Sequence, residues 1–296
     1  MKKSFLILLL TIFVFSALVT PAQRRRNRYV TGNLQIHNFE SEIFGNKRKI
    51  RVFLPEGYAR SKEKYPVLYL NDGQNLFDPA TSQFGGLEWG VDETVLSLIR
   101  RRRIEPLIVV GIDNAGKRMR ANEYLPWEDI YLTPPVKEPN GTKYPDFITK
   151  EVMPFVEKKY RIKEGAEFTG IGGSSYGALI SLYTVLQAPD VFGRVLLESP
   201  SFYVDDARVL KMSETAQGFP AKVYLGVGTN ETGKKTCDPS DESHEAVTDV
   251  RRLADILKEK TTLKVFVEPC AVHNEAAYGR RFATALEFLY PRPARN

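Results

Sequence analysis

The residues best placed to do chemistry lie in the pentapeptide 173–177, Gly-Ser-Ser-Tyr-Gly, which fits the pattern G-x-S-x-G. In this pattern a strand turns sharply into a helix, and the central serine stands above the edge of the sheet. The glycines permit a backbone approach that a Cβ would block. The N–H groups at the start of the helix point toward whatever the serine attacks. Ser175 is therefore a candidate nucleophile, whereas Ser174 is expected to pack the turn.

A serine hydroxyl is a poor nucleophile without a general base, and the chain has three histidines. His37 lies on a predicted strand well before the motif, where a surface or packing role is expected. His244 lies in a charged run at the start of a predicted helix. His273 follows the last predicted strand, and in a parallel sheet it would lie at the same edge as Ser175. We expect His273 to be the base, with His244 as the alternative.

A carboxylate should orient the imidazole and stabilise its protonated form. In the chain order serine, acid, histidine, it should follow the strand predicted at 221–227. Glu231 is the first carboxylate beyond that strand, so it is the preferred acid. Asp238 is the next choice, and Asp241 and Glu242 lie within reach of the same loop.

An ester carbonyl under attack develops negative charge and needs backbone N–H donors. One donor should be Tyr176, which follows the serine, and the other should come from the loop after the strand predicted at 65–70. Gln74 lies in that loop and is the candidate for an oxyanion hole. The preceding Asp-Gly pair is also compatible with an ordinary turn.

Arg120 and Trp127 are the candidates for binding substrate. Arg120 could hold an anionic substrate group with two hydrogen bonds; the alternative is a surface ion pair with Glu123, which would contribute little. Trp127 could line a pocket for an aromatic or sugar group, or could instead anchor a loop or the core. The same two interpretations apply to three other aromatic residues: Trp89, Tyr124 and Tyr131.

The two cysteines, Cys237 and Cys270, lie in the loops that carry Glu231 and His273. We hypothesise a disulfide that ties these loops together, the alternative being two free thiols. Neither cysteine belongs to a cluster with metal-ligand spacing, so the sequence predicts no metal. No cofactor is expected either.

The N-terminal region accounts for the positive charge of the chain. Segment 1–22 has two lysines, an apolar run and a small-residue end, as in a secretory signal peptide. Four arginines follow in a basic linker, 23–33, and together the six cations account for the whole net charge of +6. A nucleic-acid partner is therefore not expected. We expect a secreted or periplasmic protein without stable membrane association after cleavage, or alternatively an uncleaved N-terminal anchor.

Strands and helices alternate through most of the chain, which predicts an α/β protein with a mostly parallel sheet covered by helices on both faces. A hairpin of strands 34–41 and 47–54, with one face largely exposed to water, is expected to form an antiparallel edge. Segment 114–144 reads as a long functional loop. An antiparallel start followed by a parallel remainder is the layout of an α/β-hydrolase catalytic domain, here spanning 34–292. The other expected elements are strands 65–70, 107–112, 168–171, 194–198, 221–227 and 263–267, and helices 89–102, 144–159, 241–258 and 275–290.

These motifs resemble those of the esterase D, or “putative esterase”, family of α/β hydrolases. That family includes feruloyl and acetyl-xylan esterases, S-formylglutathione hydrolases, mycolyltransferases and enterochelin-type siderophore esterases. The resemblance implies Ser175 and His273 as catalytic residues and an acid after 226–231, although some siderophore esterases work with a serine–histidine pair. The family often has histidine where Asn71 stands. The matching segments are YLNDGQNLF (69–77), VGID (110–113), RANEY (120–124), GGSSYG (172–177), GVGTNE (226–231) and the region around His273.

The sequence therefore predicts a serine carboxylic-ester hydrolase that acts through a Ser-His-acid triad and an acyl-enzyme on a small-molecule or carbohydrate ester. An acyltransferase with the same triad, a peptidase, and a non-catalytic binding protein on this scaffold are the alternatives. The identity of the ester and the oligomeric state are left open.

Overall fold

The computed structural model describes residues 29–293. The predicted signal peptide, 1–22, and most of the basic linker lie outside the described residues. The helices and strands within that range, in chain order, are β1 Asn33–Ser41, β2 Asn46–Leu54, β3 Val67–Asn71, α2 Val91–Arg100, β4 Ile108–Ile112, α3 Lys117–Tyr124, α4 Tyr144–Asp146, α5 Met153–Glu157, β5 Thr169–Ser174, α6 Tyr176–Gln187, β6 Arg194–Glu198, α7 Val204–Thr215, β7 Lys222–Gly228, α8 Glu245–Leu257, β8 Thr262–Glu268 and α9 Glu275–Leu289.

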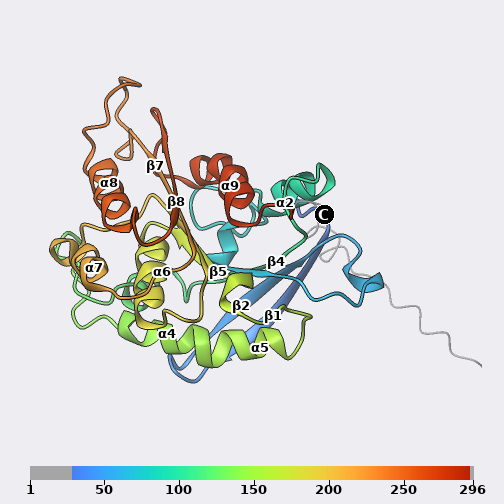
Figure 1. Ribbon diagram of the computed structural model, residues 1–296. Coiled ribbons are helices and arrows are strands. Elements are labelled where there is room, and N and C mark those ends of the chain that lie inside the picture. The colour runs from blue at the N-terminus through green and yellow to red at the C-terminus, as the bar shows by residue number, and fades with distance from the viewer. Residues whose placement is uncertain (1–28, 294–296) are drawn as a thin grey trace, which may run out of the picture.

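The strands form one eight-stranded sheet in the order β1-β2-β4-β3-β5-β6-β7-β8 (Figure 1). The pairs β1–β2 and β2–β4 are antiparallel, and all later pairs are parallel. The predicted antiparallel start and parallel remainder are confirmed. Because the carboxyl ends of parallel strands share one edge, the loops after β3, β5, β7 and β8 meet there.

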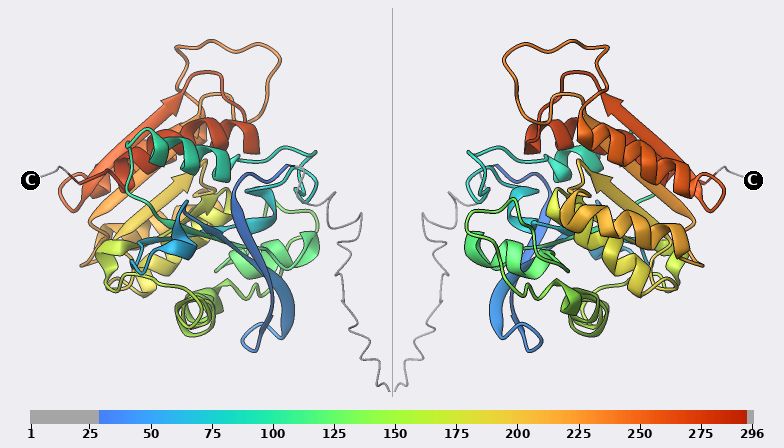
Figure 2. Two further views of the ribbon diagram at one scale, coloured as in Figure 1. Left: turned by 90° about the vertical axis from the view of Figure 1, so that its right-hand side faces the viewer. Right: turned by 90° about the vertical axis from the view of Figure 1, so that its left-hand side faces the viewer.

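Helices cover both faces of the sheet (Figures 1 and 2). Helices α2 and α9 pack on one face with one cluster of buried apolar side chains, which includes alternate residues of β3 such as Leu68 and Leu70. The longer cluster on the other face joins Val67 and Tyr69 to α4, α6, α7 and α8. Alternate residues of β3 thus point to opposite faces, and both faces are buried. The strand is therefore a continuous apolar run in the sequence.

The hairpin differs from the prediction that one of its faces is largely wet. Arg51 and Phe53 of β2 are both buried. Arg51 forms a two-bonded ion pair with Asp113, at 2.7 and 3.0 Å, and Phe53 packs against Phe77. Since β2 lies between β1 and β4, β1 is the only strand of the hairpin at an edge of the sheet. The buried Arg51 of β2 is neutralised inside the protein by Asp113.

Two helices lie where none was predicted. Segment 114–144, expected to be a loop, contains α3, and α7 lies between β6 and β7. The segment between β7 and α8 extends beyond the rest of the molecule (Figure 2). Within residues 29–293 no helix has both the length and the apolar character needed to cross a bilayer.

Candidate active site

The turn between β5 and α6 has the geometry that the G-x-S-x-G pattern predicts. Ser175 precedes α6 with φ 58° and ψ −126°, a backbone conformation that a residue with a Cβ rarely adopts. Its N–H donates to the Glu198 carbonyl at 3.0 Å, which holds the strained residue against β6. A Cβ built on Gly173 would lie only 3.0 Å from the carbonyl carbon of Gly177, so the turn needs glycine there.

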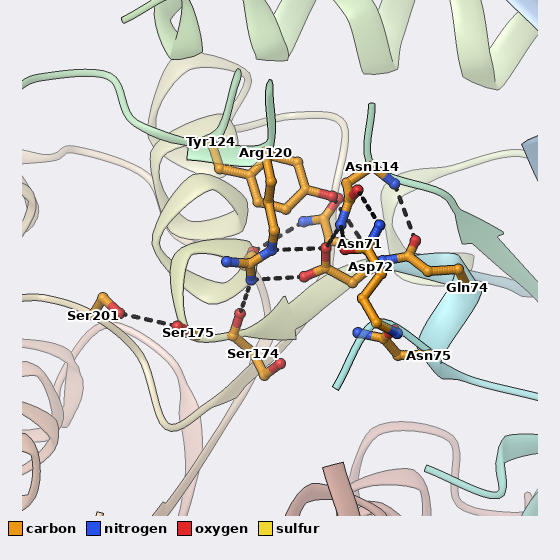
Figure 3. Close-up of polar contacts among 12 residues, drawn as sticks. Asn71, Asp72, Gln74, Asn75, Asn114, Arg120, Tyr124, Ser174, Ser175 and Ser201 are labelled. Atoms are coloured by element: carbon orange, nitrogen blue, oxygen red, sulfur yellow. Dashed lines mark hydrogen bonds and ion pairs between the residues drawn. The ribbon is translucent and has the colours of Figure 1, made fainter. Parts of the chain in front are cut away.

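The Ser175 hydroxyl contacts a second hydroxyl. Its Oγ lies 3.3 Å from Ser201 Oγ, in the segment after β6 (Figure 3). Ser174 is buried and packs the turn, as predicted. No hydrogen bond joins Ser175 to His273 within the described part of the chain. Catalytic hydrogen bonds are often long in enzymes without substrate and shorten when it binds.

His273 and Glu231 are brought together. His273 Nδ1 lies 2.6 Å from Glu231 Oε2. The other carboxylate oxygen accepts hydrogen bonds from Ser199 Oγ at 2.7 Å and from the Gly228 N–H at 2.6 Å. Burial of Glu231 opposes ionisation, but His273 and these two donors outweigh it and lower the pKa of Glu231. The site therefore holds an ionised carboxylate against one imidazole nitrogen.

The rival residues lie elsewhere. Asp238 is exposed and accepts hydrogen bonds from Ser240. His244 caps the N-terminus of α8, where its Nδ1 accepts from the Ala246 N–H at 3.2 Å. His37 Nε2 lies 2.6 Å from the Tyr160 hydroxyl, in the packing role expected for it. Of the three histidines, His273 is the one whose ring contacts Glu231.

The loop after β3 presents Gln74 near this edge. Asp72 adopts a left-handed conformation, with φ 57°, and a short 3₁₀ turn, η2 (Gly73–Asn75), follows. The Gln74 side chain accepts from the Asn114 N–H at 3.2 Å, which fixes the turn. The first N–H groups of a helix have no acceptor within that helix. Gln74 in η2 and Tyr176 at the start of α6 therefore offer N–H donors of the kind that an oxyanion hole requires.

Arg120 makes contacts that the sequence did not indicate. Its guanidinium forms a two-bonded ion pair with Asp72, at 2.9 and 2.8 Å, and reaches the Ser174 carbonyl at 3.5 Å (Figure 3). The alternative of an Arg120–Glu123 surface pair is wrong, because Glu123 is buried and pairs with Arg48 at 2.8 Å. Two of the Arg120 nitrogens already hold the loop after β3, and a role in binding substrate stays a prediction.

The four aromatic candidates divide between the core and the surface. Trp89 is buried against Tyr278 and Phe282 of α9, so the hypothesis that it lines a pocket is wrong. Tyr124 is also fully buried, and its hydroxyl accepts from the Asp72 N–H at 3.2 Å.

Trp127 and Tyr131 lie nearer the surface. The Trp127 ring is partly buried and packs against Tyr183 at 5.4 Å, with the Arg208 guanidinium 4.9 Å from the ring centroid. Tyr131 is 74% exposed and meets the Tyr203 ring at 5.7 Å. Trp127 thus has an anchoring contact, and its contact with substrate stays a prediction.

Several residues at the site were missed by the sequence analysis. Ser199 and Ser201 directly follow β6, whose carboxyl end meets the same edge as Ser175; the Ser-Pro-Ser segment after that predicted strand was the signal that could have found them. Asp129 accepts a hydrogen bond from the Tyr176 hydroxyl at 2.5 Å and from the Tyr203 hydroxyl at 3.2 Å. No pattern marks Asp129, because it lies in an irregular segment.

The hypothesised disulfide is present in the structure. Cys237 and Cys270 are joined, with their Cα atoms 5.7 Å apart. Thr229 adds a second link, since its hydroxyl accepts from the Cys270 N–H at 2.8 Å. The loop that carries Glu231 and the loop that carries His273 are thus cross-linked.

No group of three or more His, Cys, Asp or Glu side chains between residues 29 and 293 is arranged to hold a metal ion.

The chain is similar to several known proteins. The family model described as “Putative esterase” matches residues 41–289. YbbA, an uncharacterised protein of Bacillus subtilis, is 27% identical over 84% of this chain and 95% of its own length. The iron(III) enterobactin esterase of Escherichia coli is 28% identical, over 56% of this chain but only 35% of that protein.

Solved structures share the fold. The BES protein from Bacillus cereus superposes with a TM-score of 0.66 at 21% identity, covering 88% of this chain and 96% of that one. A ferulic acid esterase gives a TM-score of 0.63 at 18% identity, covering 87% and 98% of the two chains. The predicted α/β-hydrolase fold is confirmed.

Proposed function

Because the chain belongs to the “Putative esterase” family and is a carboxylic ester hydrolase, we propose that it acts through a Ser175-His273-Glu231 triad. Ser175 Oγ attacks the ester carbonyl, and His273 Nε2 takes the hydroxyl proton and returns it to the leaving alcohol. The N–H groups of Gln74 and Tyr176 bind the oxyanion. Water, activated by the same imidazole, then cleaves the acyl-enzyme.

The observation that carries this proposal is the 2.6 Å contact between His273 Nδ1 and Glu231 Oε2. An ionised carboxylate can only accept hydrogen bonds, so Nδ1 must carry the proton of the neutral imidazole. Nε2 is then left as the acceptor that a general base needs. The strained Ser175 at the same edge of the sheet supplies the nucleophile.

The contact between His273 and Glu231 also bears on the choice between a triad and a serine–histidine pair. A pair that works without an acid would not need a buried carboxylate with a lowered pKa at the second imidazole nitrogen. We therefore propose the triad, and take enterobactin and feruloyl esters, which the names of relatives mention, as members of the substrate class to test.

We propose that segment 34–292 is the catalytic domain and that the protein is exported behind the signal peptide 1–22. The Cys237–Cys270 disulfide supports export, because disulfides persist in oxidising compartments. The substrate is a small-molecule or carbohydrate ester.

The test is kcat/KM of three variants on a panel of p-nitrophenyl, feruloyl and catecholate esters. Ser175→Ala should lose activity by several orders of magnitude. Glu231→Ala should lose about 10³–10⁴-fold, as expected when the imidazole is no longer oriented. Asp238→Ala is the matched control, an exposed carboxylate in the same loop, and should retain full activity.

Near-normal turnover by Ser175→Ala would refute the nucleophile, and near-normal turnover by Glu231→Ala would leave a serine–histidine pair. Analysis of products formed in the presence of alcohol and sugar acceptors decides between a hydrolase and an acyltransferase. Hydrolysis should dominate.

A further inference from the structure

The carboxylate of Glu231 is connected to a buried arginine through a single hydroxyl. Arg281 of α9 is 0% exposed, and its Nη2 donates to Ser199 Oγ at 3.1 Å. Ser199 Oγ in turn donates to Glu231 Oε1 at 2.7 Å. With the contact between Glu231 and His273, a continuous chain of hydrogen bonds leads from α9 across the end of β6 to the imidazole.

The direction of every proton in this chain follows from the groups involved. A guanidinium only donates, so Ser199 Oγ must accept from Arg281 and direct its own proton elsewhere. The acceptor within reach is Glu231, which as an anion donates to nothing. The remaining oxygen of Glu231 must then accept from His273 Nδ1. Arg281 is thus linked, through Ser199, to the carboxylate that accepts the proton of His273 Nδ1.

The positive end of the chain is held firmly. Glu198 Oε2 accepts from Arg281 Nε at 2.7 Å, and Glu268 Oε2 accepts from Nη1 at 2.9 Å. Burial alone would lower the pKa of Arg281, but Glu198 and the other nearby carboxylates raise it, so the side chain stays charged. Two carboxylates are sufficient partners for one buried guanidinium, and the remaining nitrogen, Nη2, donates to Ser199.

The backbone around Ser199 fixes the bridging hydroxyl. Ser199 has φ 41°, and its N–H donates to the Gly226 carbonyl at 2.7 Å. Gly226 has no room for a side chain, since a Cβ there would lie 2.4 Å from Glu198 Oε2. Strain of this kind persists only where the surroundings hold it in place.

We propose that Ser199 and Arg281 are positioning residues for catalysis: they orient the Glu231 carboxylate and thereby fix the imidazole tautomer with basic Nε2. This inference rests on the proposed triad and extends it to two residues that do not touch substrate. The reaction itself is unchanged, and no proton moves along the chain during it.

The test removes the bridging hydroxyl in two ways. Ser199→Ala keeps a Cβ at the strained position, and Ser199→Gly removes it and relieves the positive φ, so the glycine variant should fold at least as well. Both should lower kcat/KM about tenfold, the scale expected for one hydrogen bond to a charged group. Ser213→Ala, which removes a buried hydroxyl that donates to the Val209 carbonyl on α7, is the matched control and should be unaffected.

The pH profile separates positioning from a merely structural role. The Ser199 hydroxyl neutralises part of the negative charge on Glu231. Without this donor the carboxylate should stabilise the protonated imidazole more strongly, so the acid limb of kcat/KM should move to higher pH. His273 is also faced by Glu275 and Tyr278 of α9, which the variants leave in place. The charged groups that face the other end of the chain are also unchanged: Arg281, Glu198 and Glu268.

A double-mutant cycle with Glu231→Ala completes the test. The loss caused by Ser199→Ala should disappear in the Glu231→Ala background, because the hydroxyl has nothing left to orient. If the loss is the same in both backgrounds, the proposed positioning role of Ser199 and Arg281 is wrong while the triad stands. Full activity of Glu231→Ala alone would overturn both the triad and the positioning role. Full activity of Ser199→Gly would overturn the positioning role alone.

Discussion

The ion pair between Arg120 and Asp72 makes the sharpest prediction. It joins α3 to the loop that carries the proposed oxyanion donor Gln74, and its side chains are only 13% and 6% exposed. Burial by itself would lower the pKa of Arg120, but Asp72 raises it, so the guanidinium stays charged. Replacing Arg120 by Met should leave a buried carboxylate without its cation.

The magnitude follows from the surroundings of Asp72. Removing one partner of a buried ion pair costs about 3–5 kcal/mol. Asn114 Nδ2 still donates to Asp72 Oδ1 at 2.6 Å, so we expect the lower end of that range. For a domain of this size about 3 kcal/mol lowers Tm by roughly 6–12 °C. A loosened Gln74 N–H should lower kcat by up to about 10²-fold, the cost of one misplaced oxyanion donor.

The assay combines thermal unfolding with kinetics on neutral and anionic esters. If Arg120 pins the loop, kcat should fall for both kinds of ester. If it binds the substrate instead, KM should rise for anionic esters alone. Arg118→Met, which removes an exposed arginine two residues away on α3, is the control and should change neither quantity. Wild-type Tm and kcat in Arg120→Met would refute the reasoning.

Two further predictions concern stability. Replacing Cys237 and Cys270 together by Ser should lower the free energy of unfolding by roughly 3–4 kcal/mol, as expected for a disulfide spanning 33 residues, and denaturant unfolding measures this loss. The pKa of Glu88 is raised to about 8, mainly by burial and next by the negative charge of nearby carboxylates, Asp92 above all. The folded protein therefore binds more protons than the unfolded chain between about pH 4.5 and 8, and stability falls as pH rises through that range. Glu88→Gln should unfold at a higher temperature than the wild type at pH 8.5, and the difference should shrink toward pH 5; a difference independent of pH would contradict this.

The sequence predicted the elements whose patterns are local. Continuous apolar strands, the G-x-S-x-G turn and the order of strands and helices were visible because each depends on neighbouring residues. His273 could be selected because the parallel sheet puts its loop at the same edge as Ser175. The catalytic roles of Ser175, His273 and Glu231 stay predictions until the variants are measured.

What the sequence could not predict depends on partners distant along the chain. Arg51 reads as an exposed strand residue because its partner, Asp113, follows a different strand. Trp89 reads equally well as a pocket wall or a core residue until α9 is packed against it. Arg281 lies on a helix of mixed character, and its role depends on Ser199, more than eighty residues earlier in the chain.

The position of α9 links catalysis to the order in which the chain is made. Ser175 leaves the ribosome almost a hundred residues before His273, and α9, which supplies Arg281, follows both. At the usual rate of chain synthesis, a nascent chain therefore carries its nucleophile for several seconds without a base or a positioned acid. Under the proposed mechanism, a chain that stops before His273 and α9 has no esterase activity, so hydrolysis begins only once these residues have been made and have docked.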